Sequence, residues 1–68
     1  MQTLYTVKGM TCDHCVAHVT EEVSQIPGVE QVEVQLAGPM TVTSAQPVDF
    51  AAIELAVSEA GNYTVATA

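Results

Sequence analysis

The two cysteines of this 68-residue chain stand three positions apart, in the segment Gly9-Met10-Thr11-Cys12-Asp13-His14-Cys15. Two residues spaced i and i+3 on the first turn of a helix have Cβ atoms about 5–6 Å apart, close enough for both sulfurs to bind one ion. Thiolate sulfur is a soft ligand that favours Cu(I), and Zn(II) where enough ligands are present, over calcium or magnesium. The spacing therefore predicts a soft-metal site formed by Cys12 and Cys15.

The position of these thiols at the start of a helix is expected to favour metal binding. Exposed backbone N–H groups and the positive end of the helix dipole stabilise thiolate over thiol, and the thiolate is the form that binds metal. Cu(I) accepts two or three soft ligands, whereas a structural zinc site normally has four. A four-ligand zinc site would also need His14 and His18, which lie four residues apart on a helix and should not converge with both cysteines. Cu(I) is the expected metal, and zinc is the alternative.

Two other uses of a Cys-X-X-Cys pair are open from the sequence. A disulfide is one, although the reducing cytosol disfavours it and so short a loop would stabilise the fold little. A thiol oxidoreductase is the other, because thioredoxin-like proteins also carry this pair at a helix start. The chain is shorter than that fold requires, and its order of elements differs. Nothing in the sequence resembles a catalytic constellation, so we expect a binding protein and not an enzyme.

The elements that position the cysteines follow from hydrophobic periodicity. Alternation of apolar and polar residues predicts strands over residues 3–8, 31–36, 40–44 and 63–65. A three–four spacing of apolar residues predicts helices over residues 13–26 and 50–60. Asp49 is expected to cap the second helix, and Thr11 to help cap the first.

The order β-α-β-β-α-β predicts an α+β protein with the ferredoxin-like arrangement, a sandwich in which two helices pack on one face of a four-stranded antiparallel sheet. The second and third strands are expected to pair as a hairpin. This topology places the cysteine-bearing loop and the loop before the last strand at the same end of the molecule. The length predicts one domain over residues 1–68, with a core too small to enclose a deep cavity.

Charge and hydropathy exclude several classes of partner. Eight acidic residues against one lysine give a net charge of −7, which should repel nucleic acid and anionic lipid. The charge suits a partner with a basic patch, or it serves solubility alone. The longest weakly polar stretch, residues 50–57, contains Glu54 and is far short of the roughly 20 apolar residues that span a bilayer. With no secretory signal at residues 1–4, a cytoplasmic location without membrane insertion is expected.

The segment from Gly9 to Cys15 resembles the Gly-Met-Thr/Ser-Cys-X-X-Cys signature of the heavy-metal-associated (HMA) domain family. The order of elements, the segment 27–29 and the segment 60–63 extend the resemblance over essentially the whole chain. Within the family, the likeness is to the small bacterial copper chaperones of the CopZ type. The resemblance implies a carrier in copper homeostasis that binds one Cu(I) through two cysteine sulfurs. It would pass the ion to a copper-transporting P-type ATPase or to a copper-responsive transcription regulator.

Other roles within the same fold are a carrier of zinc, cadmium or mercury, and a metal-binding module of an ATPase. Because Met1 lies close to the first strand and no linker is evident, we expect a freestanding chaperone.

The resemblance also implies roles for three residues near the cysteines. Met10 has a thioether that can bind Cu(I), but the family assigns this methionine to packing beneath the metal loop. Tyr63 matches a tyrosine in the loop that faces the metal, where its hydroxyl would shield a sulfur or donate to it, and ordinary core packing is the alternative. His14 is expected to face solvent, or else to bind copper in a copper-bridged dimer of a chain that is otherwise monomeric. His18 is expected to be a solvated surface residue.

Overall fold

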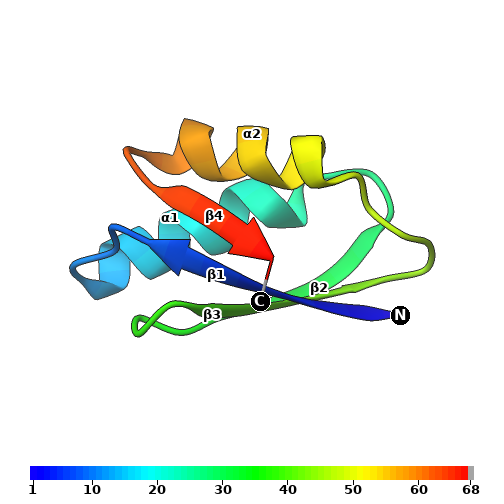
Figure 1. Cartoon of the computed structure of the whole chain (residues 1–68), viewed down its shortest axis with the longest axis horizontal. Coiled ribbons are helices and arrows are strands. Elements are labelled where there is room, and N and C mark those ends of the chain that lie inside the picture. Colours follow the sequence, from blue (N-terminus) through cyan, green and yellow to red (C-terminus); the bar gives the residue numbers. More distant parts are fainter. Residues whose placement is uncertain (68) are drawn as a thin grey trace.

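The computed structural model describes residues 1–67 and contains six elements. They are β1 (Gln2–Lys8), α1 (Asp13–Ser24), β2 (Val29–Val34), β3 (Pro39–Ser44), α2 (Phe50–Ala60) and β4 (Thr64–Thr67). Both helices lie on the same side of the sheet (Figure 1). The predicted fold class, a ferredoxin-like α+β sandwich, is confirmed.

The sheet has the strand order β2-β3-β1-β4, with every neighbouring pair antiparallel. β2 and β3 form the predicted hairpin, while β1 lies in the middle and pairs with β3 on one side and β4 on the other. The pairing of β1 with β4 ends where Lys8 lies opposite Thr64. The loop that leaves β1 therefore starts beside the loop that enters β4, which brings the cysteine segment next to Tyr63.

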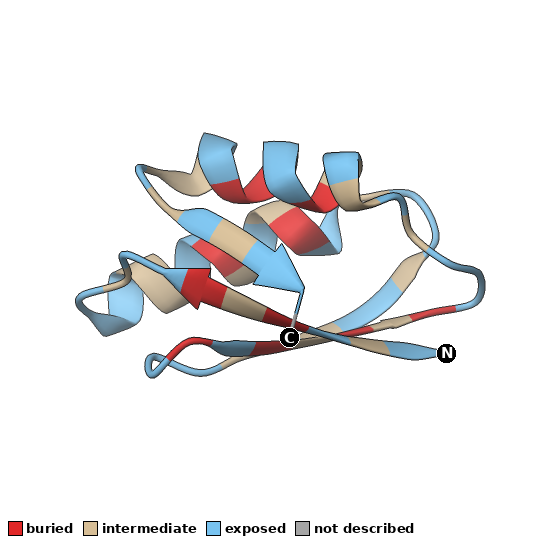
Figure 2. Ribbon diagram, in the orientation of Figure 1, coloured by how far each residue is buried: buried red, intermediate tan, exposed pale blue. Residues whose placement is uncertain are grey.

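The core lies between the sheet and the helices and is built from the inward positions of each element (Figure 2). Its buried hydrophobic members are Tyr5, Val7, Val19, Val23, Met40, Val42, Ile53, Ala56 and Val57. The strand residues among them alternate along the chain, and the helix residues recur at three–four spacing, as the sequence patterns require. The only aromatic contact given by the described residues joins Tyr5 and Phe50, whose ring centroids are 6.2 Å apart.

The boundaries of every element except α2 differ by one or two residues from those that the sequence patterns predict. α1 ends at Ser24, short of the predicted residue 26. Leu36 was predicted within the second strand, but it lies in the turn after β2 and is 45% exposed. The cause is a tight turn in which the Gly38 N–H donates to the Gln35 carbonyl at 2.9 Å, so the chain reverses before Leu36 can pair.

Neither helix has a side-chain capping hydrogen bond, although the predicted residue, Asp49, does cap α2 by position. Asp49 does occupy the N-cap position of α2, but its side chain makes no capping hydrogen bond. Its backbone carbonyl accepts instead from the N–H groups of Ala52 and Ile53, at 3.0 and 3.3 Å. At α1 the N-cap residue is Cys12 and not Thr11. No helix within residues 1–67 is long and apolar enough to cross a membrane.

Shortening the buried side chain of Ile53, in the middle of α2, by one methylene is expected to destabilise the fold. Ile53 is fully buried, so Ile53→Val should lower the free energy of unfolding by about 1 kcal/mol, measured by urea denaturation. Leu55 lies on the opposite side of the same helix and is 60% exposed, so Leu55→Ala should change stability by no more than about 0.5 kcal/mol. Equal losses for the two variants would contradict this description of the core.

Candidate metal centre

The two cysteines occupy different positions at the start of α1. Cys12 has extended backbone geometry, with φ −158° and ψ 172°, and its carbonyl accepts from the N–H groups of Cys15 and Val16 at 3.0 and 3.4 Å. Cys15 lies one turn further along the chain, inside the helix. Cys12 is exposed and Cys15 is half-buried. The helix start thus presents one open and one partly sheltered thiol at the rim of the molecule.

The Sγ atoms of Cys12 and Cys15 are 3.6 Å apart, and both cysteines are free. A disulfide would require about 2.05 Å between the sulfurs. Two sulfurs that bind one ion, each at a metal–sulfur distance of about 2.3 Å, can be separated by up to about 4.6 Å. The observed separation therefore allows both sulfurs to contact a single metal ion without movement of the backbone.

The pKa of the Cys15 thiol is lowered from its ordinary value of 9.0 to about 6. The largest cause is hydrogen bonding by the Thr11 backbone, followed by the Tyr63 hydroxyl, while partial desolvation opposes both. Hydrogen bonds to a thiolate stabilise the charged form, and this lowers the pKa. Thr11 also places its own hydroxyl oxygen 3.9 Å from the Cys15 sulfur. At neutral pH, Cys15 is therefore mostly thiolate.

Tyr63 lies half-buried just before β4, and its pKa is raised mainly because its hydroxyl hydrogen-bonds to Cys15. Its ring fits against two glycines. A Cβ atom added at Gly61 would lie 2.7 Å from the ring carbon Cε2, and one added at Gly9 would lie 3.3 Å from Cδ1. Gly9 also has φ +104°, a conformation that side-chain-bearing residues rarely adopt. These two glycines leave room for the ring.

Sequence reasoning identified Tyr63 but did not predict that Gly61 makes room for its ring. The contact between the Gly61 backbone and the Tyr63 ring depends on how the chain turns between α2 and β4. The spacing of Gly61 and Tyr63, two residues apart after a helical pattern, was the only signal available.

The remaining residues singled out from the sequence differ in how far they are exposed to solvent. Met10 is half-buried and packs against the core, the position of a packing residue. His14 and His18 are both exposed. Within residues 1–67, no three or more His, Cys, Asp or Glu side chains are grouped so that they could hold a metal ion. The fold therefore brings together Cys12, Cys15 and Tyr63, and does not gather the histidines with them.

A ferredoxin-like fold with two cysteines at the start of its first helix is typical of small metal-binding domains. Residues 4–63 match the sequence profile described as the heavy-metal-associated domain. The chain belongs to that family.

Individual relatives carry names that refer to copper. The copper chaperone CopZ of Enterococcus hirae is 40% identical over 63 residues, which are 90% of this chain and 91% of that protein. Copper-transporting ATPase 1 of Rhizobium meliloti is 43% identical over 58 residues, which are 84% of this chain and 7% of the ATPase. A solved CopZ metallochaperone has a TM-score of 0.85 and 28% identity, and the match covers 97% of this chain and 100% of that one. Similarity thus extends both to a small copper chaperone and to part of a copper-transporting ATPase.

Removing the Tyr63 hydroxyl is expected to raise the pKa of Cys15. Because the folded thiol has a pKa of about 6, its alkylation rate in the wild-type protein should fall as the pH drops through that value and level off above it. In Tyr63→Phe the midpoint should move to higher pH, because the thiolate loses a hydrogen-bond donor. The measurement is the pH profile of iodoacetamide alkylation in a Cys12→Ser background, which isolates Cys15. Gly61→Ala should shift the midpoint in the same direction by displacing the ring, and an unchanged profile in both variants would refute the assigned contact.

Proposed function

We propose that this chain is a cytoplasmic Cu(I) carrier, in which Cys12 and Cys15 bind one copper ion and release it to an acceptor protein by ligand exchange. The observation that carries the proposal is a pair of free sulfurs 3.6 Å apart on an open rim, one of them with a lowered pKa. We also propose that residues 1–68 act as a single heavy-metal-associated domain. The resemblance to a copper chaperone and to part of a copper-transporting ATPase supports copper as the metal.

The donor set favours Cu(I) over zinc. The described residues bring two cysteine sulfurs together and add no third His, Cys, Asp or Glu to them. Two soft ligands satisfy Cu(I), whereas zinc normally requires four ligands and would have to recruit the rest from elsewhere. A zinc carrier, or a carrier of another soft metal, is the second candidate because the thiolates themselves do not exclude it.

Exchange can begin at Cys12, because this sulfur is exposed while Cys15 is partly sheltered and hydrogen-bonded. An acceptor thiolate forms a bond to the bound Cu(I), and the bond from the Cys12 sulfur then breaks. A second acceptor thiolate displaces Cys15 in the same way. Copper remains Cu(I) throughout, no free ion is released, and no substrate is chemically converted. The role is therefore that of a carrier and not of an enzyme or a thiol oxidoreductase.

The proposed acceptor is the metal-binding domain or entry site of a copper-transporting P-type ATPase, in line with the resemblance to part of such an ATPase. A copper-responsive transcription regulator is the alternative acceptor. Either acceptor must present thiolates of its own, since the mechanism requires sulfur to replace sulfur.

Loss of either cysteine is expected to lower Cu(I) affinity by orders of magnitude, because a single thiolate cannot form the chelate. Cys12→Ser and Cys15→Ser should both keep the circular dichroism of the wild type, since both residues lie outside the buried core. The measurement is anaerobic competition with calibrated Cu(I) chelators, with a parallel Zn(II) titration of the reduced protein. His18→Ala serves as the control and should bind copper normally. Wild-type Cu(I) affinity in either serine variant would overturn the proposed site. Tighter binding of Zn(II) than of Cu(I) by the reduced wild-type protein would make zinc the expected metal.

His14 is exposed, so His14→Ala is expected to leave Cu(I) affinity in the monomer unchanged. We propose that the metal-free chain is a monomer. A copper-bridged dimer that uses His14 as a ligand would appear in sedimentation as a copper-dependent dimer, whose fraction falls in the His14→Ala variant. A dimer fraction that does not change would assign His14 to solvent.

A further inference from the structure

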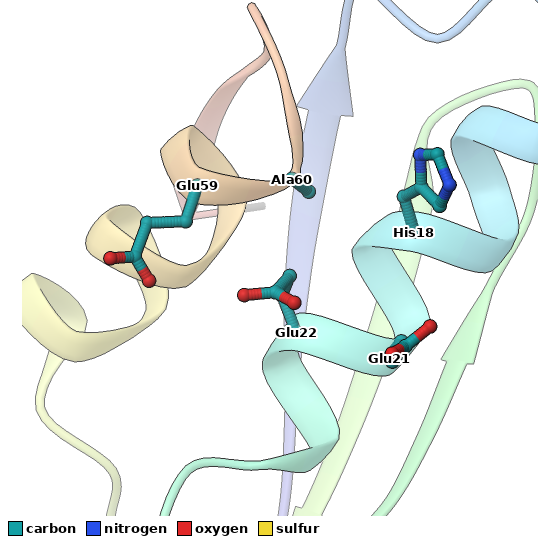
Figure 3. A pocket seen from close by; sticks show the side chains of 5 residues that line it. All are labelled: His18, Glu21, Glu22, Glu59 and Ala60. Carbon is teal, nitrogen blue, oxygen red and sulfur yellow. The ribbon is translucent and has the colours of Figure 1, made fainter.

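The two histidines of the chain, His14 and His18, lie one turn apart on α1, and the proposed Cu(I) site of the monomer uses neither of them. Residues four apart on a helix lie on the same face, with Cβ atoms about 5–6 Å apart. Both side chains are exposed. Figure 3 shows His18 on α1, one turn before Glu21 and Glu22. The helix therefore presents two accessible imidazoles as neighbours on one face.

A pair of histidines at this spacing can bind one metal ion through two nitrogens. The two zinc-binding histidines of the His-Glu-X-X-His motif stand at i and i+4 on one helix face, the same spacing as here. Imidazole suits Cu(II), Ni(II) and Zn(II), and for a given set of ligands the affinity is highest for Cu(II). Cu(II) also prefers a tetragonal arrangement of nitrogen and oxygen ligands, in which two imidazoles can occupy neighbouring positions. The pair should therefore bind Cu(II) more tightly than the other two ions.

The charges around the pair favour a cation. A groove of about 310 Å³ between α1 and α2 is lined by His18 together with the carboxylates of Glu21, Glu22 and Glu59 (Figure 3). Neither helix carries a lysine or an arginine. Carboxylates that are not neutralised by nearby cations raise the local concentration of metal ions. The field of these residues therefore assists the two imidazoles, which supply the ligand atoms.

The histidine pair is a different kind of site from the cysteine pair. Thiolate sulfur is a soft ligand that favours Cu(I), whereas imidazole nitrogen also suits divalent ions. Within residues 1–67, no three His, Cys, Asp or Glu side chains are grouped to hold one metal ion, so the histidines do not complete the sulfur site. For the same reason, water would have to fill the coordination positions that the two imidazoles leave open.

We propose that His14 and His18 form a second metal site, which binds one divalent transition-metal ion, and Cu(II) most tightly. The ion is held by one nitrogen of each imidazole, and water completes its coordination. This site goes beyond the proposed carriage of Cu(I), because it uses neither cysteine and binds copper in its other oxidation state.

The test uses the Cys12→Ser/Cys15→Ser variant, because this chain has no other thiol that could bind or reduce the added ion. Titration with Cu(II) should show one ion bound tightly per chain, and its electron paramagnetic resonance spectrum should show coupling to imidazole nitrogens. Addition of His14→Ala or His18→Ala should weaken binding about a hundredfold, because the second imidazole binds as a ligand already held on the same molecule. Undiminished affinity in either variant would overturn the proposal.

The matched control is Asp13→His/His14→Asp in the same background. Asp13 and His14 are both exposed, and exchanging them keeps the composition and the net charge of the chain. The two imidazoles would then lie five residues apart, which is about 140° around a helix of 3.6 residues per turn. Because they no longer share a face, this variant should bind Cu(II) as weakly as the single alanine variants. Binding as tight as in the parent would show that the spacing is irrelevant and would refute the site.

Chelation within one chain can be separated from bridging between two chains. The Cu(II)-loaded Cys12→Ser/Cys15→Ser variant should sediment as a monomer, since both ligands come from one helix. Its urea midpoint should rise on addition of Cu(II), because an ion that binds the folded helix preferentially stabilises the folded state. A Cu(II)-dependent dimer would place the two imidazoles of each site on different chains, which is incompatible with the proposal.

Discussion

The pairing of β1 with β4 brings two loops into contact at one end of the sheet, and the geometry of the sulfurs depends on that contact. The last paired residues are Lys8 and Thr64. Immediately beyond them, a Cβ atom at Gly9 would approach the Asn62 carbonyl oxygen to 3.1 Å. The chain can pass this point only because Gly9 has no side chain and adopts positive φ. The start of α1 then lies close to Tyr63, whose hydroxyl helps to lower the pKa of Cys15.

The packing of α1 against the core also fixes the position of the helix start that carries the cysteines. Val19 and Val23 are completely buried against the sheet and α2, so the helix cannot slide or rotate without exposing them. The backbone of Cys12 is fixed in turn by the hydrogen bonds that its carbonyl accepts. The packed core therefore holds in place the helix whose start carries the two sulfurs at the surface. This arrangement gives an open site a defined geometry without burying it.

The two cysteines differ in solvent exposure and in hydrogen bonding to the sulfur. Cys15 is partly covered and receives hydrogen bonds, so its thiolate is stable at neutral pH. Cys12 is open to solvent and accessible to a partner. Since the core occupies the space between helices and sheet, the two sulfurs are left at the surface, at the start of α1.

The sequence alone determined the order of elements and the fold class, and it singled out the pair of cysteines proposed to bind metal, because each depends on local patterns. Alternation in β1 and three–four spacing in the helices identified most of the inward residues. Local patterns failed at Leu36, where a tight turn interrupts the alternation, and at Asp49, whose side chain makes no cap although its position is correct. Only the tertiary structure showed that Gly9 and Gly61 accommodate the Tyr63 ring, and that Glu22 and Glu59 face one groove. Those relations join residues that are distant in the chain, and they exist only after the strands pair and the helices pack.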